Sequence, residues 1–166
     1  MSRLQDAIDQ IVFARKYTIN LLDTIDPSDW FRMPAEGVTH VAWQVGHLAM
    51  AQYRLGMLCI WGPRPGDDEL IAPAFLKAFK RESVADLDPT NNPSPVDIRA
   101  TFDRVHDQLQ AELAVMPEAD LDLPLVTPSR LSATRIACLR WCAAHEMLHG
   151  GQIGLLRRLF GHRPLW

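Results

Sequence analysis

The sequence predicts an all-α protein, specifically a four-helix bundle with a long crossover between helices 2 and 3. Four long segments place apolar residues three and four positions apart, which is the spacing of one face of a helix. There is no β-hairpin signal, internal repeat or second-domain linker. The 166 residues are therefore expected to form a single domain, 1–166, which is long enough to bury a sizeable core.

The first helix is expected over about residues 2–25 and ends before Pro27, because a residue that precedes proline avoids the helical backbone conformation. The second is expected over about residues 39–61, with Thr39 as its N-cap. Gly62-Pro63 follows the second segment and ends it.

The third helix is expected over about residues 94–116, because Ser94-Pro95-Val96-Asp97 is typical of a capping box with proline at the first helical position. The fourth is expected over about residues 132–160, with Gly161 as its C-cap. Outside the histidine face of this helix, five apolar residues are expected in the core, namely Ile136, Leu139, Leu148, Leu155 and Leu156.

The connection between the second and third helices spans roughly thirty residues, and a connection of this length is usually functional or a crossover. In a four-helix bundle, such a crossover lets neighbouring helices run parallel. Phe75 and Phe79 lie in its apolar first half. They are expected to fold back onto the bundle, although docking of a partner on them is an alternative.

Composition excludes several classes of function. A net charge of −3 argues against a nucleic-acid-binding surface, which needs clustered Lys and Arg. The polar N-terminus lacks a signal-peptide apolar run, and the most apolar stretch, residues 41–60, is interrupted by polar and charged residues. Three cysteines do not make a disulfide framework. We therefore expect a cytoplasmic protein that contacts no membrane.

The chemistry is expected to lie with three histidines. His145 and His149 are four residues apart in the fourth helix, on one face and separated by about 6 Å along its axis. Such a pair can bind one metal ion. His47, in the apolar second helix, would by itself more often be a hydrogen-bonded core residue, but the pair favours it as a third ligand. Three imidazoles leave coordination positions open, which is typical of catalytic sites.

Two stretches then resemble a known family, the DinB-like (DinB/YfiT) metalloprotein superfamily: Trp43-Gln44-Val45-Gly46-His47-Leu48-Ala49 and His145-Glu146-Met147-Leu148-His149-Gly150-Gly151-Gln152-Ile153. The resemblance covers nearly the full chain. It implies a three-histidine site for zinc, nickel or a similar metal, and frequently a homodimer. It also implies thiol S-transferases or isomerases that use mycothiol, bacillithiol or glutathione, beside members with no assigned activity. No motif here selects one subfamily.

Four further residues are candidates for substrate binding. Gln152 shares the histidine face, with a simple polar bond between helices as the alternative. Arg54 lies seven residues beyond His47 and could meet an anionic group, although a surface or salt-bridged arginine is commoner. Trp43 and Trp141 each precede a proposed ligand by one turn, and either line a cavity or pack in the core.

Four other polar residues are expected to have roles mainly outside the metal site. His40 lies about 10.5 Å along the helix from His47, so it is expected to be a helix-end residue rather than a residue of the pocket. Cys142 is either a thiolate ligand or a small core residue. Glu146 is expected to point away from the histidine face, or to support an imidazole of another helix. His106 is expected to be exposed.

Gly150 and Gly151 lie inside the fourth predicted helix, where each costs about 1 kcal/mol relative to alanine. Close approach of another helix or of a ligand would explain them, and the sequence does not separate the two.

The leading hypothesis is a metal-dependent enzyme that activates a thiol or a water molecule. Thiol transfer to a small electrophile comes first by resemblance, and hydrolysis second. The alternative is a non-catalytic metal-binding or dimerising bundle, in which the ion only joins two helices. Because three imidazoles accept zinc, nickel, copper or iron, the sequence does not select the metal.

Overall fold

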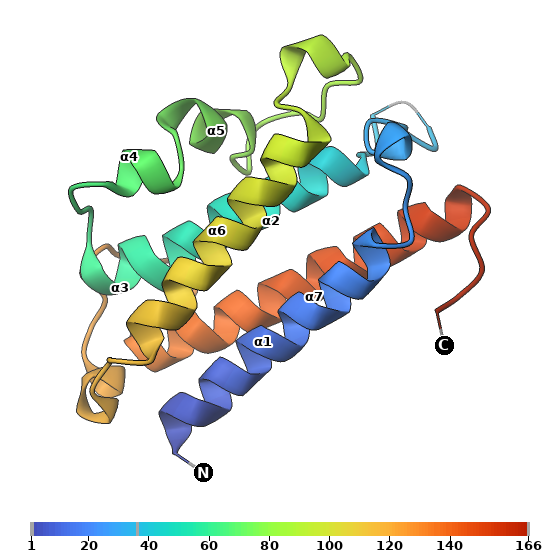
Figure 1. Cartoon of the computed structure of the whole chain (residues 1–166). Coiled ribbons are helices and arrows are strands. Elements are labelled where there is room, and N and C mark those ends of the chain that lie inside the picture. The colour runs from blue at the N-terminus through green and yellow to red at the C-terminus, as the bar shows by residue number, and fades with distance from the viewer. Residues whose placement is uncertain (1, 36, 166) are drawn as a thin grey trace.

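The structure, a computed structural model, describes residues 2–35 and 37–165, and over these residues it is all-helical with no strand. Figure 1 shows the four long helices side by side. They are α1 (Arg3–Leu22), α2 (Val41–Tyr53), α6 (Pro95–Leu113) and α7 (Arg135–Leu159). The predicted fold class is confirmed.

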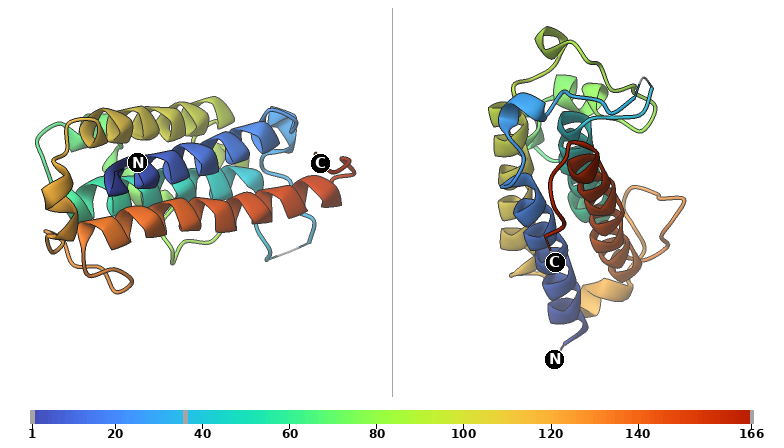
Figure 2. Two further views of the ribbon diagram at one scale, coloured as in Figure 1. Left: turned by 90° about the horizontal axis from the view of Figure 1, so that it is seen from below. Right: turned by 90° about the vertical axis from the view of Figure 1, so that its right-hand side faces the viewer.

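The first and last helices run parallel. Arg15 of α1 pairs with Glu146 of α7, and Leu21 lies beside Gly154, so residue numbers rise together along the two helices. The two views of Figure 2 show α1 and α7 adjacent along most of their length.

The helices on either side of the crossover also run parallel. Gln52 of α2 contacts His106 of α6, and Gly56 lies against Leu109. Because α2 lies antiparallel to α7, the order of directions along the chain is up, down, down, up. This is the parallel pairing that a long crossover permits.

The helix boundaries differ from the predicted ones by a few residues. His40, not Thr39, caps α2, since its Nδ1 accepts from the Trp43 backbone N–H. Thr134 caps α7, so this helix begins later than expected. Ser94 caps α6 as predicted, and its hydroxyl accepts from the Asp97 backbone N–H.

The second predicted helix continues beyond α2 to the expected end but changes its winding. A π-helical turn, η2 (Arg54–Leu58), joins α2 to α3 (Cys59–Trp61). Gly62 then ends the run with φ of +77°, a left-handed conformation that favours glycine. A π-turn inside an α-helix is rare and is frequently found at functional sites.

Short elements fill the connections. The crossover contains α4 (Asp67–Leu70), α5 (Pro73–Ala78) and η3 (Pro89–Asn91). Single 3-10 turns, η1 (Pro27–Asp29) and η4 (Glu118–Asp122), lie in the other two connections.

The crossover folds back onto the bundle, as predicted. Phe75 and Phe79 are buried. A Cβ atom placed on Gly46 of α2 would lie 2.4 Å from the Phe79 ring, so only glycine lets the two segments approach this closely.

A buried ionic network crosses the core. The Arg15 guanidinium of α1 donates to Glu146 of α7 at 2.9 Å, to the Gln52 side chain of α2 at 2.7 Å and to the Phe102 carbonyl oxygen of α6 at 2.7 Å. Glu146 therefore points away from the histidine face, as expected, and its partner is an arginine rather than an imidazole. His106 was predicted to be exposed, which is wrong, because it is half-buried beside Gln52.

Two residues of α7 that were predicted to lie in the core do not lie there. Leu148 and Leu155 are exposed, because α7 packs against the bundle with one stripe and these two leucines lie outside that stripe. No helix in the described part of the chain combines the length and apolar character needed to cross a membrane.

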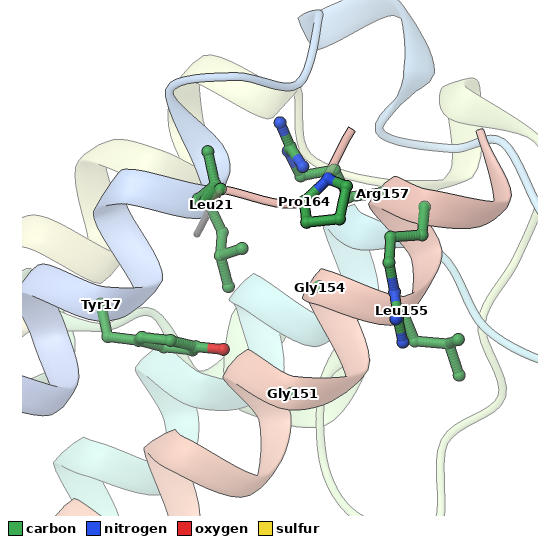
Figure 3. A pocket seen from close by; sticks show the side chains of 9 residues that line it. Tyr17, Leu21, Gly151, Gly154, Leu155, Arg157 and Pro164 are labelled. Atoms are coloured by element: carbon green, nitrogen blue, oxygen red, sulfur yellow. The ribbon is translucent and has the colours of Figure 1, made fainter. Parts of the chain in front are cut away.

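The glycine pair of α7 has two different environments. A Cβ on Gly150 would lie 3.0 Å from the Tyr17 ring, so close approach of α1 explains this glycine. Gly151 has no such neighbour within 4 Å. Figure 3 shows Gly151 and Gly154 facing a groove of about 210 Å³ that Tyr17 and Leu21 of α1 border.

Candidate metal centre

Three histidines meet where α2 crosses α7. His47 comes from α2, and His145 and His149 come from one face of α7. Each offers one ring nitrogen, and the three nitrogens lie within 4.8 Å of one another. Among the described residues, this is the only group of three or more His, Cys, Asp or Glu side chains placed to hold a metal ion.

Hydrogen bonds orient two of these imidazoles. Nδ1 of His47 lies 2.8 Å from the carbonyl oxygen of Phe79, which can only accept, so Nδ1 carries the proton. Nδ1 of His149 lies 2.5 Å from Oε1 of Gln44 and donates in the same way. Both rings therefore present an unprotonated Nε2, the form that binds metals.

The amide of Gln44 is itself held in place. Its Nε2 donates to the Thr39 hydroxyl at 3.1 Å, which directs its Oε1 toward His149. Thr39 thus supports the site instead of capping the helix. His40 has the expected helix-end role, because its Nε2 donates to the carbonyl oxygen of Asp86 while its Nδ1 caps α2.

All three imidazoles are neutral near pH 7. Burial, with help from the neighbouring histidines, lowers the pKa of His149 to about 3. Burial and the proximity of His47 lower the pKa of His145 to about 4. The pKa of His47 is also lowered, mainly by burial. A neutral imidazole keeps a lone pair for a metal, so the cluster is ready to bind one.

The donor set fits a divalent transition metal. Zinc is commonly bound by imidazole nitrogens, and the three offered here come together from two neighbouring helices. Cys142 is not a member of the group. It is buried, and burial raises the pKa of its thiol to about 12, which disfavours the thiolate needed for ligation. Cys142 is therefore a core residue rather than a ligand.

The two tryptophans lie against the cluster in different ways. Trp43 stacks on His47, with ring centroids 4.8 Å apart and planes 6° from parallel, and its indole N–H donates to the Ser83 hydroxyl. Trp141 meets His145 edge-on at 6.1 Å. Trp43 thereby joins the crossover to the histidines.

A groove of about 550 Å³ opens beside the cluster. Trp43, Gln44, His149 and Gln152 line it, which is where two of the four candidate substrate residues were expected. Gln152 lies three residues after His149 in α7, so both side chains reach this groove. Trp141 does not line this groove.

Arg54 also lies outside the groove. It is exposed at the start of the π-turn, near Cys59. The structure therefore brings Trp43 and Gln152 to the groove, but not Trp141 or Arg54.

Sequence reasoning missed the residues that support the ligands. Gln44 lies three positions before His47 on the same helix face, and this spacing was a usable signal. The Phe79 carbonyl and Ser83 carried no such signal, because only the fold of the crossover brings them to the site.

These features define an all-helical bundle with a cluster of one buried and two partly buried histidines that could hold a metal ion. A model of the DinB superfamily matches residues 10–153. The chain belongs to the DinB superfamily, which is metal-associated, and the resemblance drawn from its motifs is confirmed. Among curated proteins, none matches this sequence.

Proposed function

We propose that the protein is a metal-dependent enzyme in which His47, His145 and His149 bind one divalent transition metal, zinc or nickel first. The observation that carries the proposal is a three-imidazole cluster beside a groove of about 550 Å³, with no fourth His, Cys, Asp or Glu in the group among the described residues. A closed structural site would complete its coordination with a fourth side chain. A metal ion with an open coordination position beside a groove could contact a substrate that enters the groove.

The metal would supply Lewis acidity, which lowers the pKa of a thiol or water so that it attacks as an anion near neutral pH. The side chains have separate tasks. Gln44 and the Phe79 carbonyl fix the rings of His149 and His47. The Trp43 ring, stacked on His47, shields one side of the cluster from water. The Gln152 amide offers a donor and an acceptor to a substrate in the groove.

Thiol transfer is the first reaction that we propose, with a low-molecular-weight thiol as co-substrate and a small electrophile as acceptor. In this reaction the thiol sulfur forms a bond to the electrophilic carbon, its proton passes to solvent, and the leaving group departs. Metal-dependent hydrolysis at the same cluster is the second candidate, since both reactions need an open coordination position.

The test of the metal site is elemental analysis of tag-free protein, wild type beside His145→Ala and His149→Ala. His162→Ala, beyond the last helix, is the control. We expect close to one transition metal per chain in the wild type and the control, and loss from both cluster variants. A wild type that stays metal-free after reconstitution would contradict the proposal and favour a structural bundle.

The two reactions are then separated by their products. We expect metal-loaded protein to consume free thiol in the presence of an electrophile, measured for glutathione, bacillithiol and mycothiol. Hydrolysis without thiol consumption would favour the second candidate instead.

We also propose a homodimer. A hollow between α1 and α7 is lined by Phe13 and Met147, and Phe13 is exposed. A large exposed apolar side chain beside such a hollow suits burial against a second copy. Light scattering should give twice the chain mass, and Phe13→Glu should give a monomer. A monomeric wild type at all concentrations would exclude the dimer.

A further inference from the structure

The groove beside the histidine cluster has an unusual concentration of exposed apolar side chains. Val84 is 84% exposed, Val38 and Leu159 are each 55% exposed, and Leu155 is 49% exposed. All four line the groove. Val38 lies in the connection before α2, Val84 in the crossover, and the two leucines in the last turns of α7.

The polar and apolar residues of the groove are separated along the axis of α7. His149 and Gln152 stand at one place along α7, and Leu159 lies ten residues after His149, about 15 Å farther along the helix axis. Polar groups therefore gather near the histidines, and apolar groups continue toward the C-terminal end of the helix.

Charge is absent from the lining. None of the described residues that border the groove is Lys, Arg, Asp or Glu. The smaller groove of Figure 3 provides a contrast, because Arg157 and Arg158 border it. Away from His149 and its proposed metal, an ionic group in the larger groove would lose water without gaining a charged side chain among the described lining residues.

The size suits a small molecule. At about 30 Å³ for each water-sized unit, a volume of 550 Å³ holds roughly fifteen to twenty non-hydrogen atoms. The described part of the C-terminal tail does not fill it, since Pro164 and Leu165 border the other groove, against α1.

We propose that this groove binds the uncharged, hydrocarbon-rich part of the substrate, an aryl or alkyl group, and leaves the reactive polar end at His149. Covering the four exposed side chains is the source of affinity. The position of the reactive end rests on the proposed function, whereas binding of the apolar group does not. Val38, Val84, Leu155 and Leu159 then determine which electrophiles the protein accepts.

The experiment measures binding of the uncharged fluorophore N-phenyl-1-naphthylamine to metal-loaded protein. Val84→Asp should raise the Kd at least tenfold, because it places a charge on the groove wall. Val115→Asp is the matched control, since Val115 is 82% exposed in the connection after α6 and does not line the groove. It should leave the Kd unchanged. Circular dichroism verifies that both variants fold.

Competition then tests the chemistry of the ligand. The competitors are compared on metal-free protein, because a carboxylate or an amine could bind the metal directly. Decanol should displace the fluorophore at least tenfold more effectively than decanoate or decylammonium at pH 7. Equal displacement by an ionic competitor would overturn the assignment to an uncharged group. Equal Kd values for Val84→Asp and Val115→Asp, or no binding to the wild type, would overturn the groove as the site. Loss of fluorophore binding as protein concentration rises would assign the groove to a second copy of the chain.

His145→Ala separates this inference from the metal proposal. His145 is a member of the cluster but does not line the groove. The variant should lose metal and retain the fluorophore. The wild type could bind no metal while the fluorophore still has a higher Kd for Val84→Asp than for Val115→Asp. That result would contradict the proposed metal-dependent reaction but would support the groove as a binding site for apolar groups.

Discussion

At the scale of single residues, the Gln44 amide fixes the orientation of the His149 ring by accepting a hydrogen bond from its Nδ1. Gln44→Leu removes the acceptor of the Nδ1–H bond and leaves this proton without its partner. Because loss of such a supporting group typically costs about 10–100-fold in metal affinity, we expect a decrease of that size. Competition with a chromophoric chelator measures it. Gln108→Leu, on exposed α6 surface, is the control, and equal affinities for the two variants would show that Gln44 does not orient the ligand.

The close contact at Gly46 makes a second prediction. The Cβ of Gly46→Ala would meet the Phe79 ring at 2.4 Å, so the crossover must shift. We expect a loss of about 1–3 kcal/mol in the free energy of unfolding, the usual range for overpacking. We also expect weaker metal binding, because the Phe79 carbonyl orients His47.

Gly151→Ala is the matched control for Gly46→Ala. Its Cβ has open space within 4 Å, and alanine favours a helix over glycine by about 1 kcal/mol. Urea unfolding should therefore show stabilisation for Gly151→Ala and destabilisation for Gly46→Ala. A Gly46→Ala protein as stable as the wild type would mean that Phe79 moves freely.

At the scale of elements, the Arg15–Glu146 pair joins α1 to α7 inside the core. Burial lowers the pKa of Arg15 and raises the pKa of Glu146, and the attraction between the two charges opposes both shifts. Arg15→Met or Glu146→Leu alone should cost about 3–5 kcal/mol, since each leaves a buried charge without its partner. The double variant should lose much less than the sum, as a double-mutant cycle from urea unfolding would show. Additive losses would mean that the pair is not coupled.

Hydrophobic periodicity predicted the four long helices, and the length of the crossover indicated that the helices on either side of it can run parallel. It placed the helix ends less well, because caps such as His40 and Thr134 depend on side-chain hydrogen bonds and not on a face. Hydrophobic periodicity also does not distinguish the π-turn at Arg54–Leu58 from the α-helix around it. The spacing of His145 and His149, with His47, predicted the cluster, since these residues lie on regular helices. The contacts of Phe79 and Ser83 escaped prediction because they depend on long-range packing.

At the scale of the whole molecule, burial of neutral histidines links stability to pH. Burial, and then the charge of Arg15, lower the pKa of His106 to about 3, against about 6.5 in an unfolded chain. The unfolded state therefore binds a proton first as pH falls. The stability that depends on neutral His106 is complete above about pH 6.5 and is lost as pH falls toward 3.

We expect the urea midpoint of metal-free protein to fall between pH 7 and pH 4. His106→Gln, which stays neutral, should show a smaller fall than the wild type over the same range. Identical pH profiles for the two proteins would exclude His106 as a source of acid sensitivity.

The parallel pairing of α1 with α7 also affects synthesis of the protein. Of the four long helices, α1 is made first and is covered mainly by α7, which is made last and begins at Arg135. A chain still on the ribosome therefore carries α1 with much of its apolar face open to water until α7 has been made. Because exposed apolar surface makes incomplete chains prone to aggregate, α1 is the segment that chaperones must protect while translation continues.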